Sequence, residues 1–155
     1  MGEVLKQRLQ QTRFESPVQE AVLNLMVAAA SLDDRMSEAL APHGITPAQY
    51  NVLRILRGAS PDGYARCEIA RRALRRAPDL TRLIDRLERR RLVGRARSEA
   101  DRRRSVTRIT RRGLELLERA TPAVRAVQSG IADRLNERDA RELSRLCELL
   151  YEDAG

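Results

Sequence analysis

The sequence predicts a mainly α-helical fold with one small β-hairpin (α+β). Apolar residues recur at helical spacing through most of the chain, and only residues 92–110 show β-branched residues in partial alternation. The length of 155 residues suits one domain, and 42% hydrophobic with 34% charged residues is typical of a folded, helix-rich chain. We therefore expect one intertwined domain built largely of helices.

The first long helix is expected over residues 17–41, because Ser16-Pro17 places a capping hydroxyl before a proline at the first helical position. Its apolar residues follow a four-three spacing that is typical of a seam against another helix, and further apolar positions widen the stripe. We expect burial on two sides, an end at Pro42-His43-Gly44, and an N-terminal arm over residues 1–16. The seam consists of Val18, Val22, Leu25, Ala29, Leu32, Met36 and Ala39.

Three further helices are expected in the middle of the chain. Thr46-Pro47 starts a helix over residues 47–57, and after a turn a short helix should begin at Ala65 or Cys67 and end at Leu74. The next helix, residues 78–90, carries apolar residues at positions i, i+3, i+4 and i+7, which places them on one face. These residues are Leu80, Leu83, Ile84 and Leu87.

A hairpin and two long helices complete the pattern. Residues 92–97 and 104–110 form the strands, Thr110 caps a helix over 111–134, and Asn136 with Asp139 resembles a capping box for a helix over 137–152. A helix-turn-helix followed by a basic hairpin is a winged helix. The sequence thus predicts a winged helix-turn-helix lobe at 46–110, with a helical dimerisation region formed by 17–45 and 111–155.

The charge of the chain is concentrated in this lobe. Residues 66–112 contain eighteen arginines and six acidic residues, so this segment carries a net charge of +12, whereas the whole chain carries +8. A local positive field is what phosphate neutralisation requires. Double-stranded DNA is therefore the expected partner, and several arginines are expected to meet phosphates or to hold their neighbours. These are Arg71, Arg72, Arg75, Arg76 and Arg102.

The helix over residues 78–90 is the candidate for reading base sequence. Its apolar stripe leaves Thr81, Arg82, Asp85, Arg86 and Arg89 on the other face. An arginine fork can bind guanine O6 and N7 together, and Arg82 and Arg86 are one turn apart. The alternative is a solvated face in which Asp85 pairs with Arg82 or with Arg89.

The hairpin tip is the second candidate surface. Arg102, Arg103 and Arg104 suit a narrow minor groove, whose negative potential attracts guanidinium groups. Asp101 is interpreted as the residue that positions a neighbouring arginine through a bidentate pair. The alternative is an ordinary charged loop.

These motifs resemble the MarR family of bacterial and archaeal transcriptional regulators. The resemblance rests on residues 80–93, on Asp101-Arg102-Arg103, on residues 109–113 and on the helix that starts at residue 45, and it covers about residues 18–150. It implies a winged-helix homodimer on a palindromic DNA site, more often a repressor than an activator. By position, Thr81, Arg82 and Arg86 match the family's recognition-helix contacts, and Arg103 matches the arginine at the wing tip, with Asp101 as its partner. The full set of expected DNA-binding residues adds Arg75, Asp79 and Arg102.

Two positions depart from the family pattern. Arg91 stands where the family usually has glycine, and an arginine pays roughly 1 kcal/mol or more to adopt the left-handed backbone expected there. Ala77, at the expected N-cap of the helix over 78–90, lacks a capping oxygen. Asp79 in the first turn would compensate in part through the helix dipole.

The resemblance also implies a switch. Many family members release DNA when a small phenolic or aromatic anion binds between the dimer helices and the DNA-binding lobe, which here implies a cleft near 17–41, 47–57 and 111–134. No residue set identifies the effector. An alternative is oxidant sensing through Cys67, which lies near Arg66 and a helix start, whereas Cys147 on an apolar stripe is expected in the core and His43 in a turn.

Other classes of protein fit the sequence less well. The acidic residues are scattered or lie near arginines, the single histidine has no catalytic partner, and no phosphate-binding glycine loop appears, so we expect neither an enzyme nor a metal or cofactor site. A winged helix that binds RNA or protein is the remaining alternative, although the aromatic residues lie outside the arginine-rich segment. No secretory or membrane-spanning segment is apparent, which indicates a cytoplasmic protein.

Overall fold

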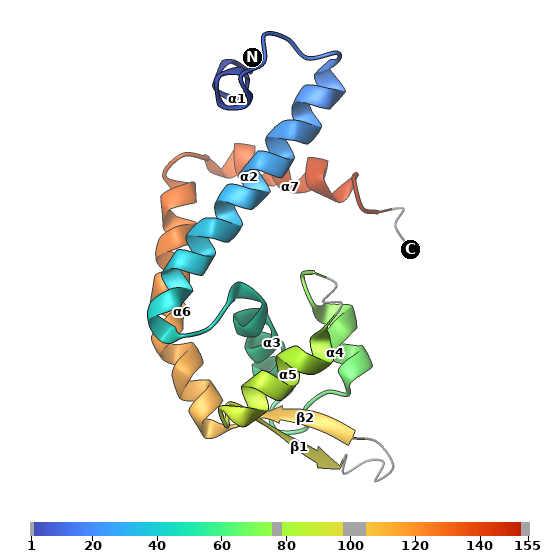
Figure 1. Ribbon diagram of the computed structural model, residues 1–155, viewed down its shortest axis with the longest axis vertical. Coiled ribbons are helices and arrows are strands. Elements are labelled where there is room, and N and C mark those ends of the chain that lie inside the picture. The colour runs from blue at the N-terminus through green and yellow to red at the C-terminus, as the bar shows by residue number, and fades with distance from the viewer. Residues whose placement is uncertain (1, 76–78, 98–104, 153–155) are drawn as a thin grey trace.

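The computed structural model describes residues 2–75, 79–97 and 105–152. In Figure 1, α2 and α6 run side by side, with α1 and α7 toward one end and a lobe of α3, α4, α5 and the β-hairpin at the other. The predicted mixture of helices with one small hairpin is confirmed. The elements are α1 (Glu3–Leu9), α2 (Pro17–Leu40), the 3-10 turn η1 (Ala41–His43), α3 (Pro47–Gly58), α4 (Arg66–Arg72), α5 (Leu80–Arg89), β1 (Val93–Arg97), β2 (Ser105–Ile109), α6 (Arg111–Ala132) and α7 (Glu137–Glu148).

Four predicted helix starts are confirmed by hydrogen bonds from backbone N–H groups to the capping side chains. Ser16 Oγ accepts from the N–H of residue 19 at 3.1 Å, and Asn136 Oδ1 accepts from the N–H of residue 139 at 2.9 Å. Thr46 and Gln49 form a reciprocal capping box at the start of α3. Thr110 Oγ1 accepts from the N–H of residue 113 at 3.1 Å. Each cap satisfies a donor that the first helical turn leaves without an intrahelical partner.

The ends of several elements differ from the sequence-based expectations. Helix α1 lies within the predicted N-terminal arm and buries Leu5. The sequence did not predict this helix because it is only seven residues long and Gly2 provides no capping side chain. Helix α4 stops at Arg72 because Ala73 is extended. Helix α5 begins at Leu80, so Asp79 and not Ala77 is the N-cap residue; Ala77 lies outside the described residues.

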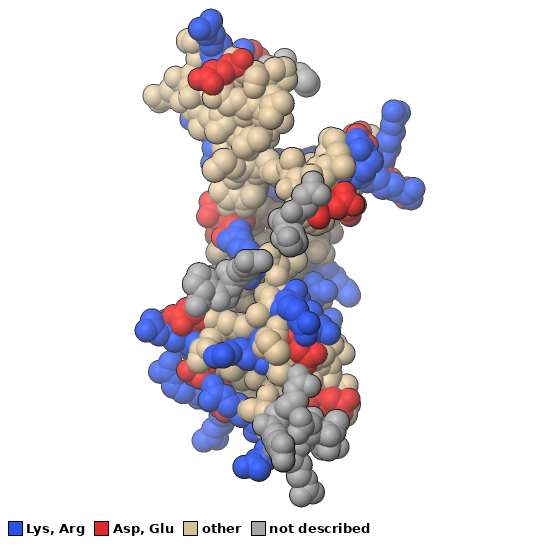
Figure 2. All heavy atoms as spheres, turned by 90° about the vertical axis from the view of Figure 1, so that its right-hand side faces the viewer, with Lys and Arg blue, Asp and Glu red and all other residues tan. Residues whose placement is uncertain are grey.

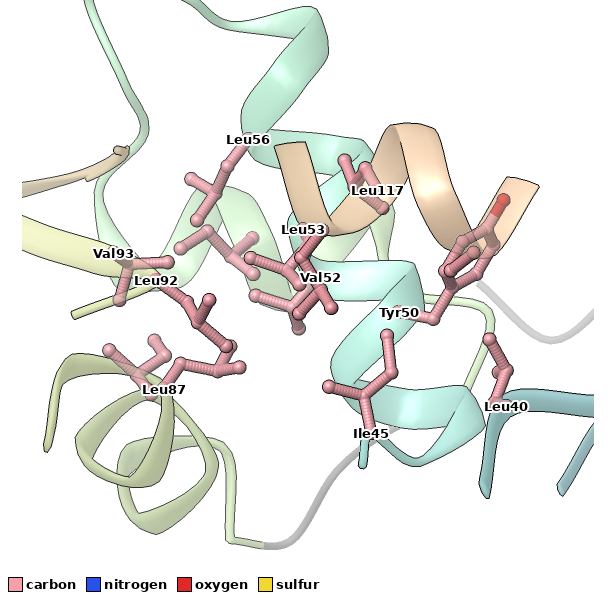
Figure 3. Close-up of a cluster of buried hydrophobic side chains, with 14 of the residues drawn as sticks. Leu40, Ile45, Tyr50, Val52, Leu53, Leu56, Leu87, Leu92, Val93 and Leu117 are labelled. Atoms are coloured by element: carbon pink, nitrogen blue, oxygen red, sulfur yellow. The ribbon is translucent and has the colours of Figure 1, made fainter. Parts of the chain in front are cut away.

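One hydrophobic core joins the lobe to the long helices (Figure 3). Leu40 of α2, Leu53 and Leu56 of α3, Leu87 of α5 and Leu117 of α6 are fully buried in it. Burying a leucine side chain contributes roughly 1.5–3 kcal/mol. Because five side chains from four helices share this core, the lobe is packed firmly against α6 and the end of α2.

The hairpin is antiparallel, with Val93 opposite Ile109 and Arg97 opposite Ser105. Tyr64 adds a bridge at the edge of β2: its N–H donates to the Thr107 carbonyl at 3.0 Å and its carbonyl accepts from the Thr107 N–H at 2.9 Å. Gly63, just before it, has φ +78°, and a Cβ there would lie 2.4 Å from the Thr107 oxygen. A glycine is therefore needed where the chain meets β2.

The terminal helices expose apolar side chains in a single chain. The predicted burial of α2 on two sides is wrong for one protomer, since Leu40 is its only fully buried residue and the side chains of Val18 and Met26 are 71% and 63% exposed. Helix α7 has no buried residue, so Cys147, predicted in the core, is only partly buried. Within the described part of the chain, α6 packs beside α2, and nothing covers the exposed stripes.

No helix in the described part of the chain combines the length and the apolar character that crossing a bilayer requires.

Candidate nucleic-acid interface

Helix α5 presents one polar face to solvent because its other face is anchored in the core. Leu80, Ile84 and Leu87 are buried, whereas the arginines at positions 82, 86 and 89 are exposed. The i, i+4, i+7 spacing places the buried residues on one face of the helix and leaves the arginines on the opposite face. The face of α5 that the sequence predicts as the DNA-binding surface is therefore accessible to a partner.

Arg82 forms an ion pair with Asp79 and not with Asp85 as the alternative interpretation had it. Its Nη1 lies 3.1 Å from Asp79 Oδ2, and the Arg82 side chain is 77% exposed. Asp79 thus orients Arg82 at the first turn of α5 and does not cap the helix with its side chain. An exposed pair of this kind contributes about 0–1 kcal/mol, so a phosphate or base edge would compete for Arg82 at little cost.

Arg86 lies one turn further along the same face. In the described residues, no hydrogen bond or ion pair engages its guanidinium group, and the residue is exposed. An arginine without a partner is free to offer both of its parallel N–H groups to a guanine. Arg86 is therefore the side chain on α5 whose donors are most available.

Thr81 is held by a residue that the sequence analysis did not select. Its Oγ1 accepts a hydrogen bond of 2.8 Å from Nη1 of Arg66, at the start of α4. The two residues are fifteen positions apart on different helices, so no local spacing reveals the contact. Arg66 therefore adds a positive charge beside the first turn of α5 and links the two helices of the helix-turn-helix.

Asp85 pairs with Arg95 of β1 and not with Arg89, the other partner that the spacing along the helix allows. The guanidinium of Arg95 forms an ion pair with Asp85, and its Nε lies 3.5 Å from Glu88 Oε2. Arg89 instead donates from Nε to the backbone carbonyl of Asp85 at 3.4 Å. One arginine of the basic segment thus ties the hairpin to α5.

The turn between α5 and β1 keeps a left-handed residue although arginine stands at the position of the family's usual glycine. Arg91 adopts φ +58°, so the substitution does not change the backbone of the turn. The Arg91 carbonyl accepts a hydrogen bond of 2.7 Å from Thr110 Oγ1, and the Arg91 N–H donates to the Glu88 carbonyl at 2.8 Å. These bonds hold the turn in place despite the missing glycine.

Arg75 lies away from the polar face of α5. Its Nη1 is 3.2 Å from Asp33 Oδ2 on α2, so it joins the segment before α5 to the long helix. Arg72 stacks on the ring of Tyr64, with 4.1 Å between the guanidinium carbon and the ring centroid. Arg76 and the expected wing-tip residues Asp101, Arg102, Arg103 and Arg104 lie outside the described residues.

A cleft of about 590 Å³ opens between α2, the start of α3, residues 73–75 and α5. Its walls are largely apolar, with Asp33, Arg54 and Arg75 as the charged groups. The expectation of a cleft beside 17–41 and 47–57 is confirmed, but the expected contribution of 111–134 is wrong. None of the described lining residues comes from α6, because Leu116, Leu117, Ala120 and Val124 on its inner face are used in the core.

Basic side chains gather on the lobe. On the face drawn in Figure 2, the lobe carries many arginine side chains, whereas α1 and the start of α2 carry few basic side chains. Among the residues that the structure describes, no group of three His, Cys, Asp or Glu side chains is placed to hold a metal ion. Cys67 and Cys147 are free, and Cys67 is exposed on α4.

A helix-turn-helix whose second helix exposes arginines, followed by a hairpin tied to that helix, defines a winged helix-turn-helix DNA-binding protein. The model of the MarR family matches residues 45–105. The HTH-type transcriptional repressor Rv2887 of Mycobacterium tuberculosis is 33% identical over 124 residues, which are 80% of this chain and 88% of that protein. The chain belongs to the MarR family and is a transcriptional regulator.

Two solved structures show the same fold. A MarR transcription factor from Planctomyces limnophilus is 39% identical, with a TM-score of 0.66 over 88% of this chain and 99% of that one. MepR of S. aureus, solved as a DNA complex, is 24% identical, with a TM-score of 0.73 over 85% of this chain and 96% of that one.

Proposed function

We propose that this regulator is a repressor that binds a palindromic operator in double-stranded DNA as a homodimer. The observation that carries the proposal is the exposed face of α5, where Arg82 and Arg86 stand one turn apart opposite a buried apolar face. On this helix both guanidinium groups would enter one major groove and read guanines. The repressor Rv2887 and the MepR–DNA complex support this assignment by similarity.

The homodimer accounts for the apolar stripes that one protomer leaves exposed. Val18, Val22 and Met26 on α2, Leu146 on α7 and Leu150 just after α7 are all exposed in the single chain. A second copy would cover them, because twofold symmetry brings the same surfaces of both protomers together. The symmetry would also set the two α5 helices about 34 Å apart, which suits half-sites one helical turn apart.

The hairpin tip would supply the second contact. Arg103 is proposed to enter the minor groove beside the half-site, with Asp101 holding its guanidinium and Arg102 meeting phosphate. The support is the position of the described strands: Arg95 ties β1 to α5, so the hairpin strands lie beside the helix that is proposed to read the major groove (Figure 1).

The cleft beside α2 is proposed as the effector site. Its volume of about 590 Å³, its apolar walls and its two arginines, Arg54 and Arg75, suit a small aromatic ligand with an acidic group. The ligand would contact α2 on one side and Leu80 and Leu83 of α5 on the other. A ligand in the cleft would therefore be able to shift α5, the helix proposed to bind DNA. The regulator would act in the cytoplasm, where its operator lies.

Fluorescence-anisotropy titration of labelled duplexes tests the proposal. Fragments from the regulator's own promoter should bind with sub-micromolar affinity that falls steeply as salt rises, because each neutralised phosphate releases counterions. Random duplex of equal length should bind at least a hundredfold more weakly at the same salt. Equal affinity for promoter and random duplex would refute a sequence-specific regulator.

A further inference from the structure

One ion pair joins two residues that line the cleft and come from different parts of the chain. Arg75, five residues before the start of α5, pairs with Asp33 on α2 at 3.2 Å, and both residues line the cleft. The residues are 42 positions apart in the sequence. The pair is a direct side-chain link between the long helix and the segment that leads into α5.

The same segment is also held from a second side. The N–H of Leu74 donates to Asn51 Oδ1 on α3 at 3.1 Å, and Asn51 lines the cleft as well. The bond to α3 lies inside the lobe, whereas the bond to Asp33 reaches the long helix. Loss of the Arg75–Asp33 pair would therefore leave the lobe folded and packed on the end of α2, but would release the segment before α5 from Asp33.

The Arg75–Asp33 ion pair is strong enough to favour one position of the segment before α5, and weak enough for another anion to replace Asp33. The side chains of Arg75 and Asp33 are 70% and 40% exposed, so water and salt screen their attraction. A carboxylate carried by an aromatic ligand would meet Arg75 against the apolar wall of the cleft, where screening is weaker. Such a ligand would compete with Asp33 for the same guanidinium group.

We propose that Arg75 and Asp33 form an ion-pair latch that holds α5 in its DNA-binding position, and that an anionic ligand in the cleft opens the latch by replacing Asp33 as the partner of Arg75. The latch rests on the proposed DNA-binding function and on the proposed effector cleft. It assigns Arg75 to regulation, in contrast to the phosphate contact that its charge suggests.

Charge exchange separates a latch from a phosphate contact. Asp33→Arg and Arg75→Asp should each weaken operator binding by roughly threefold to fivefold, the upper part of the range expected for an exposed pair. The double exchange, Asp33→Arg with Arg75→Asp, should restore affinity to within about twofold, because the pair is re-formed with opposite polarity. Arg8→Asp with Val4→Arg on α1 provides a matched control and should leave affinity unchanged.

The salt dependence of binding gives the second readout. Arg75→Gln should leave the slope of log K against log salt unchanged, since a latch residue neutralises no phosphate. A slope lowered by about one unit, or a double exchange that binds no better than Arg75→Asp alone, would overturn the latch and make Arg75 a phosphate contact. Single exchanges that bind like the wild type would overturn it too.

Thermal unfolding without DNA tests the exchange step. The probes are 2-naphthoate and its neutral isostere 2-naphthamide, each at millimolar concentration, with sodium chloride at the same ionic strength. Naphthoate should raise the Tm of the wild type by about 2 °C or more, naphthamide should raise it less, and Arg75→Gln should remove the difference. Equal shifts for the two probes, or none with naphthoate, would overturn the exchange, whereas failure of the wild type to select its operator would overturn the DNA-binding proposal alone.

Discussion

Arg95 of β1 forms an ion pair with Asp85 of α5, and this contact joins the hairpin to the helix that we propose faces DNA. Glu88, one turn further along α5, lies on the other side of the same guanidinium at 3.5 Å. Arg95, in the most basic part of the chain, therefore positions the hairpin. Its pair with Asp85 holds the hairpin against α5 together with the hydrogen bonds at the Arg91 turn.

Asp85→Asn tests whether the Arg95–Asp85 pair positions the hairpin, because the direction of the change in operator affinity separates this role from a simple charge effect. Removing a negative charge beside DNA would by itself strengthen binding, whereas loosening the hairpin would weaken it. We expect operator affinity to fall by about threefold or more in anisotropy titrations, and Arg95→Ala to have a similar effect that is not additive with the first. Asp34→Asn on α2 is the control, and a rise in affinity with Asp85→Asn would contradict the positioning role.

Arg86 and Arg103 should differ in what they contribute to recognition. Arg86→Ala should cost about 1–3 kcal/mol on the operator and much less on random duplex, because a bidentate contact to guanine is lost. Arg103→Ala should weaken binding to all duplexes and lower the salt slope by about one. Arg8→Ala on α1 removes the same charge far from the lobe. If both variants behave like that control, the surface has been assigned wrongly.

The left-handed backbone at Arg91 predicts a stabilising substitution. Arg91→Gly should raise the free energy of unfolding by about 0.5–1 kcal/mol, because glycine adopts φ +58° without a steric penalty, less the extra entropy of the unfolded chain. Arg91→Ala keeps the Cβ atom and should give no such gain. Urea unfolding midpoints measure both. A gain of equal size with alanine would show that the charge and not the backbone matters.

Gly113 is required where α6 begins under the hairpin. A Cβ at this position would lie 2.2 Å from the Leu92 carbonyl oxygen and 2.7 Å from Ile109 Cγ1. Gly113→Ala should therefore lower the free energy of unfolding by about 1–3 kcal/mol. Gly58→Ala, where a Cβ meets nothing within 4 Å, is the matched control and should be nearly neutral. A neutral Gly113→Ala in chemical unfolding would disprove the close approach.

The homodimer predicts that one buried charge will dissociate it. Met26→Glu places a carboxylate on the exposed apolar stripe of α2 and should turn the dimer into monomers at micromolar concentration, with loss of operator binding. Val4→Glu adds the same charge at a residue of α1 that is 82% exposed, and it should leave the dimer intact. Analytical ultracentrifugation distinguishes the two states. A wild type that is monomeric would leave the stripes on α2 and α7 without a function.

Local features of the sequence were enough to predict most of the architecture. Ser16, Thr46, Thr110 and Asn136 each satisfy backbone N–H groups within three residues, so the starts of α2, α3, α6 and α7 can be read from short motifs. The apolar spacing of α5 likewise determines which of its faces is buried. The exposed position of Arg82 and Arg86 follows from that spacing alone.

The partners of the charged side chains were decided by tertiary structure. Spacing within α5 suggested that Asp85 would pair with a neighbour on its own helix, but Arg95 reaches it from β1, and Arg75 turns to Asp33 on α2. The arginines are long, flexible and numerous, so many pairings are compatible with the sequence. The sequence by itself determined where the helices begin and which faces are apolar, because these depend on local hydrogen bonds and periodicity. Only the packed fold decided which arginines pair with carboxylates of other elements, because that depends on which distant carboxylate lies within reach.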